Sequence, residues 1–177
     1  MIGPRIAIRR RAGRAGGLLL YFAGKLAMRA LNARKPRRPL SEPTARRLQP
    51  LFPSTDLSRV ALVEGARLVA RWFERPPRTG GMAFCRVVYL AHPYSERTYE
   101  GLLLLAHELG HVQQIEALGE SAFARRYGEE WLAHGYAAMP LEREAERCRA
   151  EARAALSQRL PPDGGHRERN ALPSSST

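Results

Sequence analysis

The residues with the clearest capacity for chemistry form the segment His107-Glu108-Leu109-Gly110-His111, an HExxH motif. An α-helix has 3.6 residues per turn, so positions i and i+4 share a face and both imidazoles can reach one metal ion. Two imidazoles and a carboxylate leave one open position on tetrahedral zinc. Water bound there has a pKa of about 7, and Glu108 can take its proton as general base. The motif therefore predicts a Zn²⁺ site with hydrolytic chemistry.

The third metal ligand must come from another part of the chain. The longer HExxHxxGxxH motif is excluded, because position 117 is Ala117. The preferred candidate is Glu144, 33 residues after His111 on a second predicted helix. Glu142 is the alternative, two residues away and on a different face of that helix. His134 is a further alternative.

Polar residues near these candidates could assist the reaction. His134 and Tyr136 precede the ligand helix, and either could stabilise the oxyanion of a tetrahedral intermediate. The alternative interpretation is a histidine at a helix end and a tyrosine that packs. Gln114 lies shortly after the motif and could orient a ligand, or it could be an ordinary polar residue of the helix.

The motif needs a helix to present it, and the flanking sequence predicts one from about residue 98 to residue 118. Ser95 or Thr98 can cap its start, and Gly119 can end it. Apolar residues on both sides of the motif predict that this helix is largely buried. Residues 84–90 (FCRVVYL) predict a strand just upstream, which could bind an extended substrate by strand addition.

The remaining helices and strands after residue 53 are predicted from the periodicity of apolar residues and from Gly and Pro residues that interrupt it. Residues 60–63 predict a short strand, with 67–73 ambiguous between strand and helix. Downstream we expect two short helices, at 121–127 and 129–134, and a last helix from Pro140 to about residue 160. Residues 161–177 are polar and are expected to be a disordered tail.

The net charge of +12 is confined to the start of the chain. Residues 1–50 contain 13 basic residues and one acid, whereas residues 51–177 contain 16 of each. This distribution excludes a basic nucleic-acid-binding domain that spans the whole chain. Arginines precede the apolar residues 16–31, and this order has three interpretations. The segment could bind an anionic membrane surface, it could be a secretory signal or anchor, or it could be a solvated arm followed by a helix that packs on the core.

These patterns divide the chain into three parts: a basic arm with an apolar helix and a Pro-rich, extended linker (1–53), a neutral body (54–160) and the tail (161–177). The body predicts an α+β fold with a small β-sheet packed on the HExxH helix and a helical C-terminal half. Cys85 and Cys148 cannot form a disulfide framework.

Residues 57–151 resemble a bacterial metallopeptidase-like domain family found in extracellular contractile injection system cores. The similar segments are FCRVVYL, LLAHELGHVQQ and HGYAAMPLEREAE. The resemblance implies a minimal zincin-like fold of the gluzincin type, with His107, His111 and Glu144 as zinc ligands and Glu108 as the catalytic glutamate. Cys148 departs from the pattern of gluzincins that carry an aspartate there.

The sequence thus predicts a zinc metallopeptidase that acts on a peptide or protein substrate. The competing hypothesis is a non-catalytic zincin-fold module for binding or assembly, which could associate with a membrane surface through residues 1–50. We expect a protein that is cytoplasmic or peripheral to the inner membrane, with a signal or anchor as the alternative. No nucleic-acid partner is expected.

Overall fold

The computed structural model describes residues 4–67, 80–91, 96 and 98–157, with the side chains of residues 4–10 left aside. The α-helices of this part are α1 (Pro4–Leu31), α2 (Glu42–Leu48), α4 (Tyr99–Leu118), α5 (Glu120–His134) and α6 (Pro140–Ser157). The strands are β1 (Arg38–Pro39), β2 (Ala61–Val63), β3 (Gly81–Phe84) and β4 (Val87–Leu90), and three single-turn 3₁₀ helices lie at Gln49–Leu51, Leu57–Arg59 and Tyr136–Ala138. The predicted α+β class is confirmed, with most of the described chain helical.

The four strands form one mixed sheet in the order β1-β2-β4-β3. β2 runs parallel to β4, and the other two pairs are antiparallel. The prediction of one strand over 84–90 is wrong, because Cys85 and Arg86 make a two-residue turn in which Cys85 has a φ of 54°. Within the described residues, β3 is therefore the edge strand of a β3–β4 hairpin.

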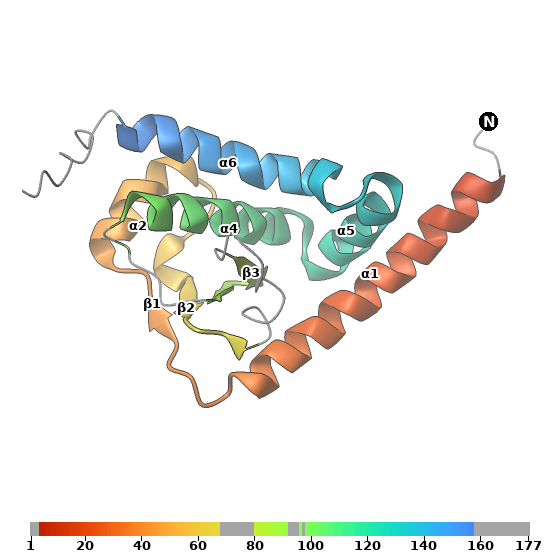
Figure 1. Cartoon of the computed structure of the whole chain (residues 1–177), viewed down its shortest axis with the longest axis horizontal. Coiled ribbons are helices and arrows are strands. Elements are labelled where there is room, and N and C mark those ends of the chain that lie inside the picture. Colours follow the sequence, from red (N-terminus) through yellow and green to blue (C-terminus); the bar gives the residue numbers. More distant parts are fainter. Residues whose placement is uncertain (1–3, 68–79, 92–95, 97, 158–177) are drawn as a thin grey trace, which may run out of the picture.

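The HExxH helix is α4, and its predicted bounds are confirmed. The Thr98 hydroxyl accepts a hydrogen bond from the Gly101 amide at 3.2 Å, and Gly119 ends the helix with a φ of 78°. Half of its residues are buried, because α6 covers one side of α4 and the sheet lies on another (Figure 1). The burial predicted from its apolar flanks is confirmed.

Two predicted breaks in the chain are absent. Residues 121–134 belong to one helix, α5, rather than two, since Gly128 packs against α1 instead of ending a helix. The linker predicted to be extended contains α2, whose start is capped by the Ser41 hydroxyl. Leu48 and Phe52 are fully buried in the core with residues of α4 and the sheet. The core thus includes residues that composition assigned to the linker.

The apolar helix predicted at 16–31 is the second half of the longer helix α1, which runs along one side of the molecule beside α5 (Figure 1). Tyr21 and Met28 of α1 are buried against the sheet and α5. Among the described helices, none combines the length and the apolar character that a membrane crossing requires. Residues 68–73 of the ambiguous segment 67–73, and the tail predicted at 161–177, lie outside the described residues.

Candidate metal centre

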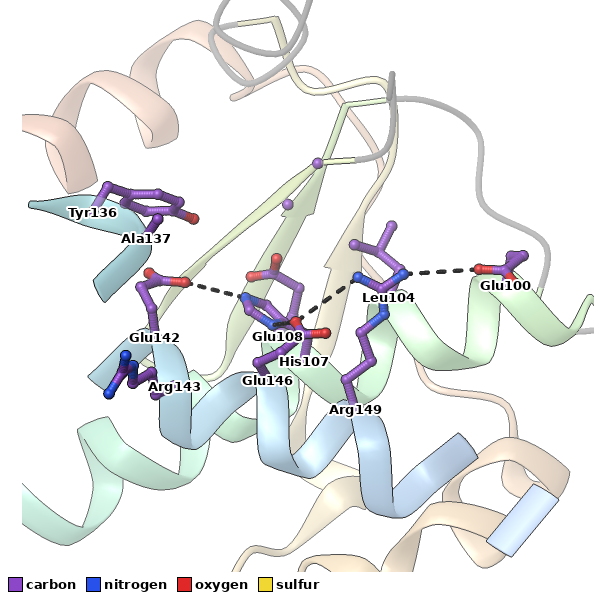
Figure 2. A pocket seen from close by; sticks show the side chains of 12 residues that line it. Glu100, Leu104, His107, Glu108, Tyr136, Ala137, Glu142, Arg143, Glu146 and Arg149 are labelled. Atoms are coloured by element: carbon purple, nitrogen blue, oxygen red, sulfur yellow. Dashed lines mark ion pairs between the residues drawn. The ribbon is translucent and has the colours of Figure 1, made fainter. Parts of the chain in front are cut away.

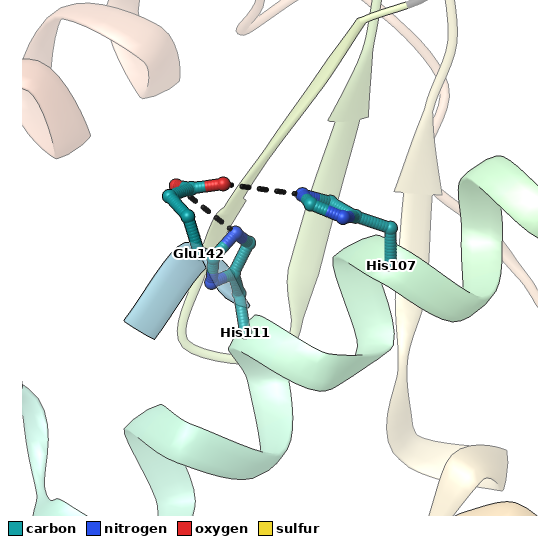
Figure 3. Close-up of side chains that lie close together, drawn as sticks. All are labelled: His107, His111 and Glu142. Carbon is teal, nitrogen blue, oxygen red and sulfur yellow. Dashed lines mark ion pairs between the residues drawn. The ribbon is translucent and has the colours of Figure 1, made fainter. Parts of the chain in front are cut away.

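Three side chains converge where α4 meets the first turn of α6 (Figure 3). The Nε2 atoms of His107 and His111 each lie 3.4 Å from an oxygen of the Glu142 carboxylate, His107 from Oε2 and His111 from Oε1. Donor atoms of all three residues lie within 4.8 Å of one another. The pairing of the two histidines predicted from their spacing is therefore present.

The spacing of these atoms fits a small divalent cation. Ligand atoms about 2.0–2.1 Å from a tetrahedral zinc ion lie about 3.3–3.4 Å apart, which is close to the separation of the Nε2 and carboxylate oxygen atoms. Two imidazoles and one carboxylate are also a donor set that such a cation accepts. His107, His111 and Glu142 therefore form a group that could bind a metal ion.

The structure brings Glu142, the alternative ligand, to the histidines instead of the preferred Glu144. Two residues along a helix differ by about 200° in direction, so only one of the two carboxylates can face α4. The rotation of α6 is set by its contact with α4, where Ala145 packs on Gly110. A methyl group added at Gly110 would lie 3.1 Å from the Ala145 Cα atom, so the two helices pack tightly at this point.

Glu144 contacts Gln114, the residue that holds His111 in place. The Gln114 Oε1 atom accepts a hydrogen bond from His111 Nδ1 at 3.0 Å, and the Gln114 Nε2 amide donates to the Leu141 carbonyl and to Glu144 Oε2. Since the Gln114 oxygen can only accept, His111 carries its proton on Nδ1 when neutral and leaves Nε2 free toward Glu142. Gln114 thus orients a ligand, as one of its two interpretations predicted.

A second network holds the start of α6. Glu130 accepts a hydrogen bond from the Leu141 amide at 2.8 Å and pairs with Arg126 at 2.6 Å. The Tyr127 hydroxyl donates to Glu142 Oε1 at 3.1 Å. These contacts tie α5 to the first turn of α6, so the position of Glu142 depends on both helices.

Glu108 lies beside the histidines in a space made by a glycine. Its side chain is buried, and its Oε2 atom has no hydrogen-bond partner among the described residues. A methyl group added at Gly81 of β3 would lie 2.6 Å from the Glu108 carboxyl carbon. A side chain at this position would therefore displace the Glu108 carboxylate, whose buried Oε2 atom is without a hydrogen-bond partner in the described part of the chain.

Burial and neighbouring charges shift the pKa values of the ionisable side chains in this site. Burial raises the pKa of Glu108, and the nearby histidines oppose this rise only in part. Burial also acts on Glu142, but hydrogen bonds from His107 and His111 outweigh it and hold the pKa of Glu142 well below its usual range. Burial lowers the pKa of His111, and contact with Glu142 overrides this and raises it to about 8. Glu142 is thus the fixed negative charge of the group.

A pocket of about 330 Å³ opens onto this group (Figure 2). His107, Glu108 and Glu142 line it, and Tyr136 lies beside Glu142 at its wall. Burial and the Glu142 carboxylate raise the pKa of Tyr136, so its hydroxyl stays protonated and can donate. His134, the other predicted stabiliser, is exposed at the last residue of α5 and is outside the pocket lining.

The comparison with known proteins found one similarity. Residues 39–119 match the eCIS core domain. The matched segment runs from β1 through α4, so it includes both histidines and Glu108, and it ends before α5, α6 and Glu142. This match supports a relation to the eCIS core family. No curated protein matches the chain, and no solved structure matches it either.

Two contributors to the site, Gly81 and Arg149, were not among the residues predicted from the sequence. Gly81 leaves the space that the Glu108 carboxylate occupies. Arg149 lines the pocket (Figure 2). No local signal could identify them, because each reaches the site through the packing of separate elements.

Proposed function

We propose that this chain is a zinc-dependent metallopeptidase whose active site is the pocket between α4, α6 and the start of β3. The observation that supports the proposal is the convergence of His107 and His111 Nε2 on the Glu142 carboxylate, with Glu108 buried beside them in an open pocket. A zinc ion held by these three ligands would supply Lewis-acid activation of water and of a substrate carbonyl.

Glu108 is the proposed general base. Its free Oε2 atom can accept a proton from the attacking water, and its raised pKa suits a group that later returns the proton to the leaving amine. Gly81 keeps the carboxylate in position by leaving space for it. Tyr136, protonated at the wall of the pocket, would donate to the developing oxyanion.

The substrate is proposed to be an extended peptide that pairs with the edge of β3. Within the described chain β3 pairs only with β4, and its first residue, Gly81, lies against Glu108. A peptide added along this edge would bring a backbone carbonyl toward the metal ligands. The strand proposed for this role is therefore β3 rather than the single strand predicted from the sequence. The match to the eCIS core domain suggests that such a peptidase works with a contractile injection system.

The test compares wild type with Glu108→Gln and Glu100→Gln, all loaded with zinc, on a diverse peptide library. Glu100 also lines the pocket, but its side chain is 68% exposed and it is absent from the metal-ligand group. We expect Glu108→Gln to bind stoichiometric zinc and to lose at least about 100-fold in cleavage rate, the scale of a general base. Glu100→Gln should cleave at the rate of wild type.

Two outcomes would overturn the proposal. If wild type binds zinc and cleaves no peptide, the chain is a metal-binding module of the non-catalytic kind. If His107→Ala/His111→Ala retains the zinc content of wild type, the metal centre itself is misplaced.

A further inference from the structure

The face of α1 that points away from the body is apolar and exposed. Leu19, Phe22 and Leu26 recur at spacings of three and four residues, so they lie on one side of the helix. Leu19 is 72% and Leu26 is 70% exposed, and Phe22 is exposed as well. Alanines at 15, 23 and 30 extend this outer apolar face along the helix, and they are exposed too.

The opposite face of α1 anchors the helix to the body, so the outer apolar face is held in a fixed orientation. A methyl group added at Gly17 would lie 2.1 Å from the Ala124 carbonyl oxygen of α5, which shows that the two backbones touch. Arg14 pairs with Glu129 of α5 at 2.7 Å, and Lys25 pairs with Glu120. The outward exposure of the leucines therefore follows from how α1 packs.

The charge of α1 distinguishes between the possible partners. The helix contains seven basic residues and no acidic residue. A second copy of the chain would place two such helices together and would be opposed by like charges. A nucleic acid would attract the basic residues but would leave exposed leucines facing a polyanion. An anionic lipid surface accepts both, because basic side chains meet its headgroups while apolar side chains enter the boundary with the acyl chains.

We propose that α1 docks the protein on an anionic membrane surface, with Leu19, Phe22 and Leu26 inserted at the interface and the exposed Arg11 and Arg29 beside them. The helix lies along the surface, and the body stays on the aqueous side. This inference is independent of the proposed peptidase activity.

The experiment measures binding of the full chain to vesicles by co-sedimentation. Vesicles of phosphatidylcholine mixed with phosphatidylglycerol are compared with vesicles of phosphatidylcholine alone. We expect at least about tenfold tighter binding to the anionic vesicles, and weaker binding at high salt. Leu19→Glu/Leu26→Glu should lower the affinity for anionic vesicles at least about tenfold, because two apolar insertions are lost and two negative charges are added.

The matched control is Ala150→Glu/Ala154→Glu, which adds the same charge at two exposed positions of α6, across the molecule from α1 (Figure 1). This variant should bind within about threefold of wild type. Arg11→Gln/Arg29→Gln tests the basic side chains without adding an acid, and we expect a loss of about fivefold per residue. Circular dichroism verifies that each variant is folded.

Equal binding of wild type to neutral and anionic vesicles, or no binding to either, would overturn the proposal. So would an unchanged affinity of Leu19→Glu/Leu26→Glu when folded, or of Arg11→Gln/Arg29→Gln. A wild-type dimer in solution that Leu19→Glu/Leu26→Glu separates, without vesicle binding, would instead assign the outer apolar face to a second copy.

Discussion

Two pairs of helices in this protein approach each other at glycines, and the two contacts differ in what lies around them. At the α1–α5 contact, methyl groups added at Gly17 and Gly128 would lie 2.1 and 2.2 Å from carbonyl oxygens of the facing helix. At the α4–α6 contact, a methyl group added at Gly110 would lie 3.1 Å from its nearest neighbour, the Ala145 Cα atom. The first contact is backbone against backbone, and the second retains side chains between the helices.

The two contacts therefore serve different purposes: the first attaches α1 to the body, and the second positions the metal-ligand residues. The α1–α5 contact is surrounded by apolar residues and surface ion pairs, and it holds a basic helix to the body. The α4–α6 contact is bordered by His107, His111 and Glu142, so its rotation decides which carboxylate meets the histidines. A disturbance of the first contact should change stability, whereas a disturbance of the second should change metal binding.

The largest expected effect concerns the third ligand. Glu142→Ala should lower zinc affinity more than about 100-fold, because it removes a ligand rather than one of the outer partners that contribute about 10–100-fold. Glu144→Ala removes a carboxylate that, in the described part of the chain, accepts hydrogen bonds from Gln114 and Arg126, and the affinity for zinc should fall a few-fold. Competition with a chromogenic chelator measures both. Equal losses, or a larger loss for Glu144→Ala, would contradict the placement of α6.

The next largest effect is on stability, at the contact that attaches α1 to α5. Gly128→Ala should lower the free energy of unfolding by about 2–3 kcal/mol, because a methyl group meets backbone that cannot rotate away. Zinc affinity should fall less than in Glu142→Ala, since the ligands themselves lie on α4 and α6, and α5 contacts the start of α6 through Tyr127 and Glu130. Urea unfolding and chelator competition provide the two measurements.

Gly16→Ala is the control for this prediction. No atom lies within 4 Å of a methyl group at Gly16, so the higher helix propensity of alanine should stabilise the protein by about 0.5–1 kcal/mol. If both alanine variants change stability in the same direction, close packing is not what distinguishes the two positions.

A smaller effect is expected at the residue that orients His111. Gln114→Leu should lower zinc affinity about tenfold, because the imidazole loses the partner of its Nδ1 atom. The neighbouring Gln113 lies about 100° away round α4, and Gln113→Leu should change the affinity less than about twofold. Matching affinities for the two variants would show that the hydrogen bond to His111 does not support the ligand.

The smallest effect concerns stability in acid, far from the metal ligands. Burial raises the pKa of Glu96, but hydrogen bonds from Ser41, Thr44 and Arg38 outweigh it and lower the pKa to about 2. A carboxylate with a lowered pKa in the folded state stabilises that state above its unfolded value of 4.5, and the contribution is lost as the pH falls toward 2. Glu96→Gln should therefore lower the free energy of unfolding at pH 7 by about 1 kcal/mol and flatten its decline in acid.

The exposed Glu42 provides the comparison for this pH effect. Its side chain is 77% exposed and pairs with Arg46 one turn along α2, so Glu42→Gln should change stability by less than about 0.5 kcal/mol. Unfolding in urea at several pH values between about 3 and 7 distinguishes the two variants. A similar acid dependence in Glu96→Gln and wild type would rule out Glu96 as the group that titrates.

Local signals in the sequence were sufficient for the HExxH helix. Thr98, the apolar flanks and Gly119 specify where α4 begins, which side is buried and where it ends. The i, i+4 spacing then places two histidines on one face. The two short helices expected at 121–127 and 129–134 are instead one helix, α5, and Gly128 between the two ranges is the site where α1 touches α5.

Turns and short helices within the core were also missed. The β3–β4 hairpin turns at Cys85, a residue that local preferences do not favour at a positive φ, so residues 84–90 resembled one strand. The linker contains many prolines, but one of them follows the Ser41 cap within the first turn of α2, where proline is tolerated. Leu48 and Phe52 then reach the core only because the rest of the fold offers them a site.

By itself, the sequence determined the helix that carries the chemistry, the two histidines and the glutamate on it, and the confinement of the positive charge to the first 50 residues. These features depend on the helical period and on composition, which are local. The tertiary structure alone decided that Glu142 faces the histidines, that Gly81 makes space for Glu108, and that the leucines of α1 point outward. Each of these depends on how one element is rotated against another, and that rotation is set by contacts between residues far apart in the chain.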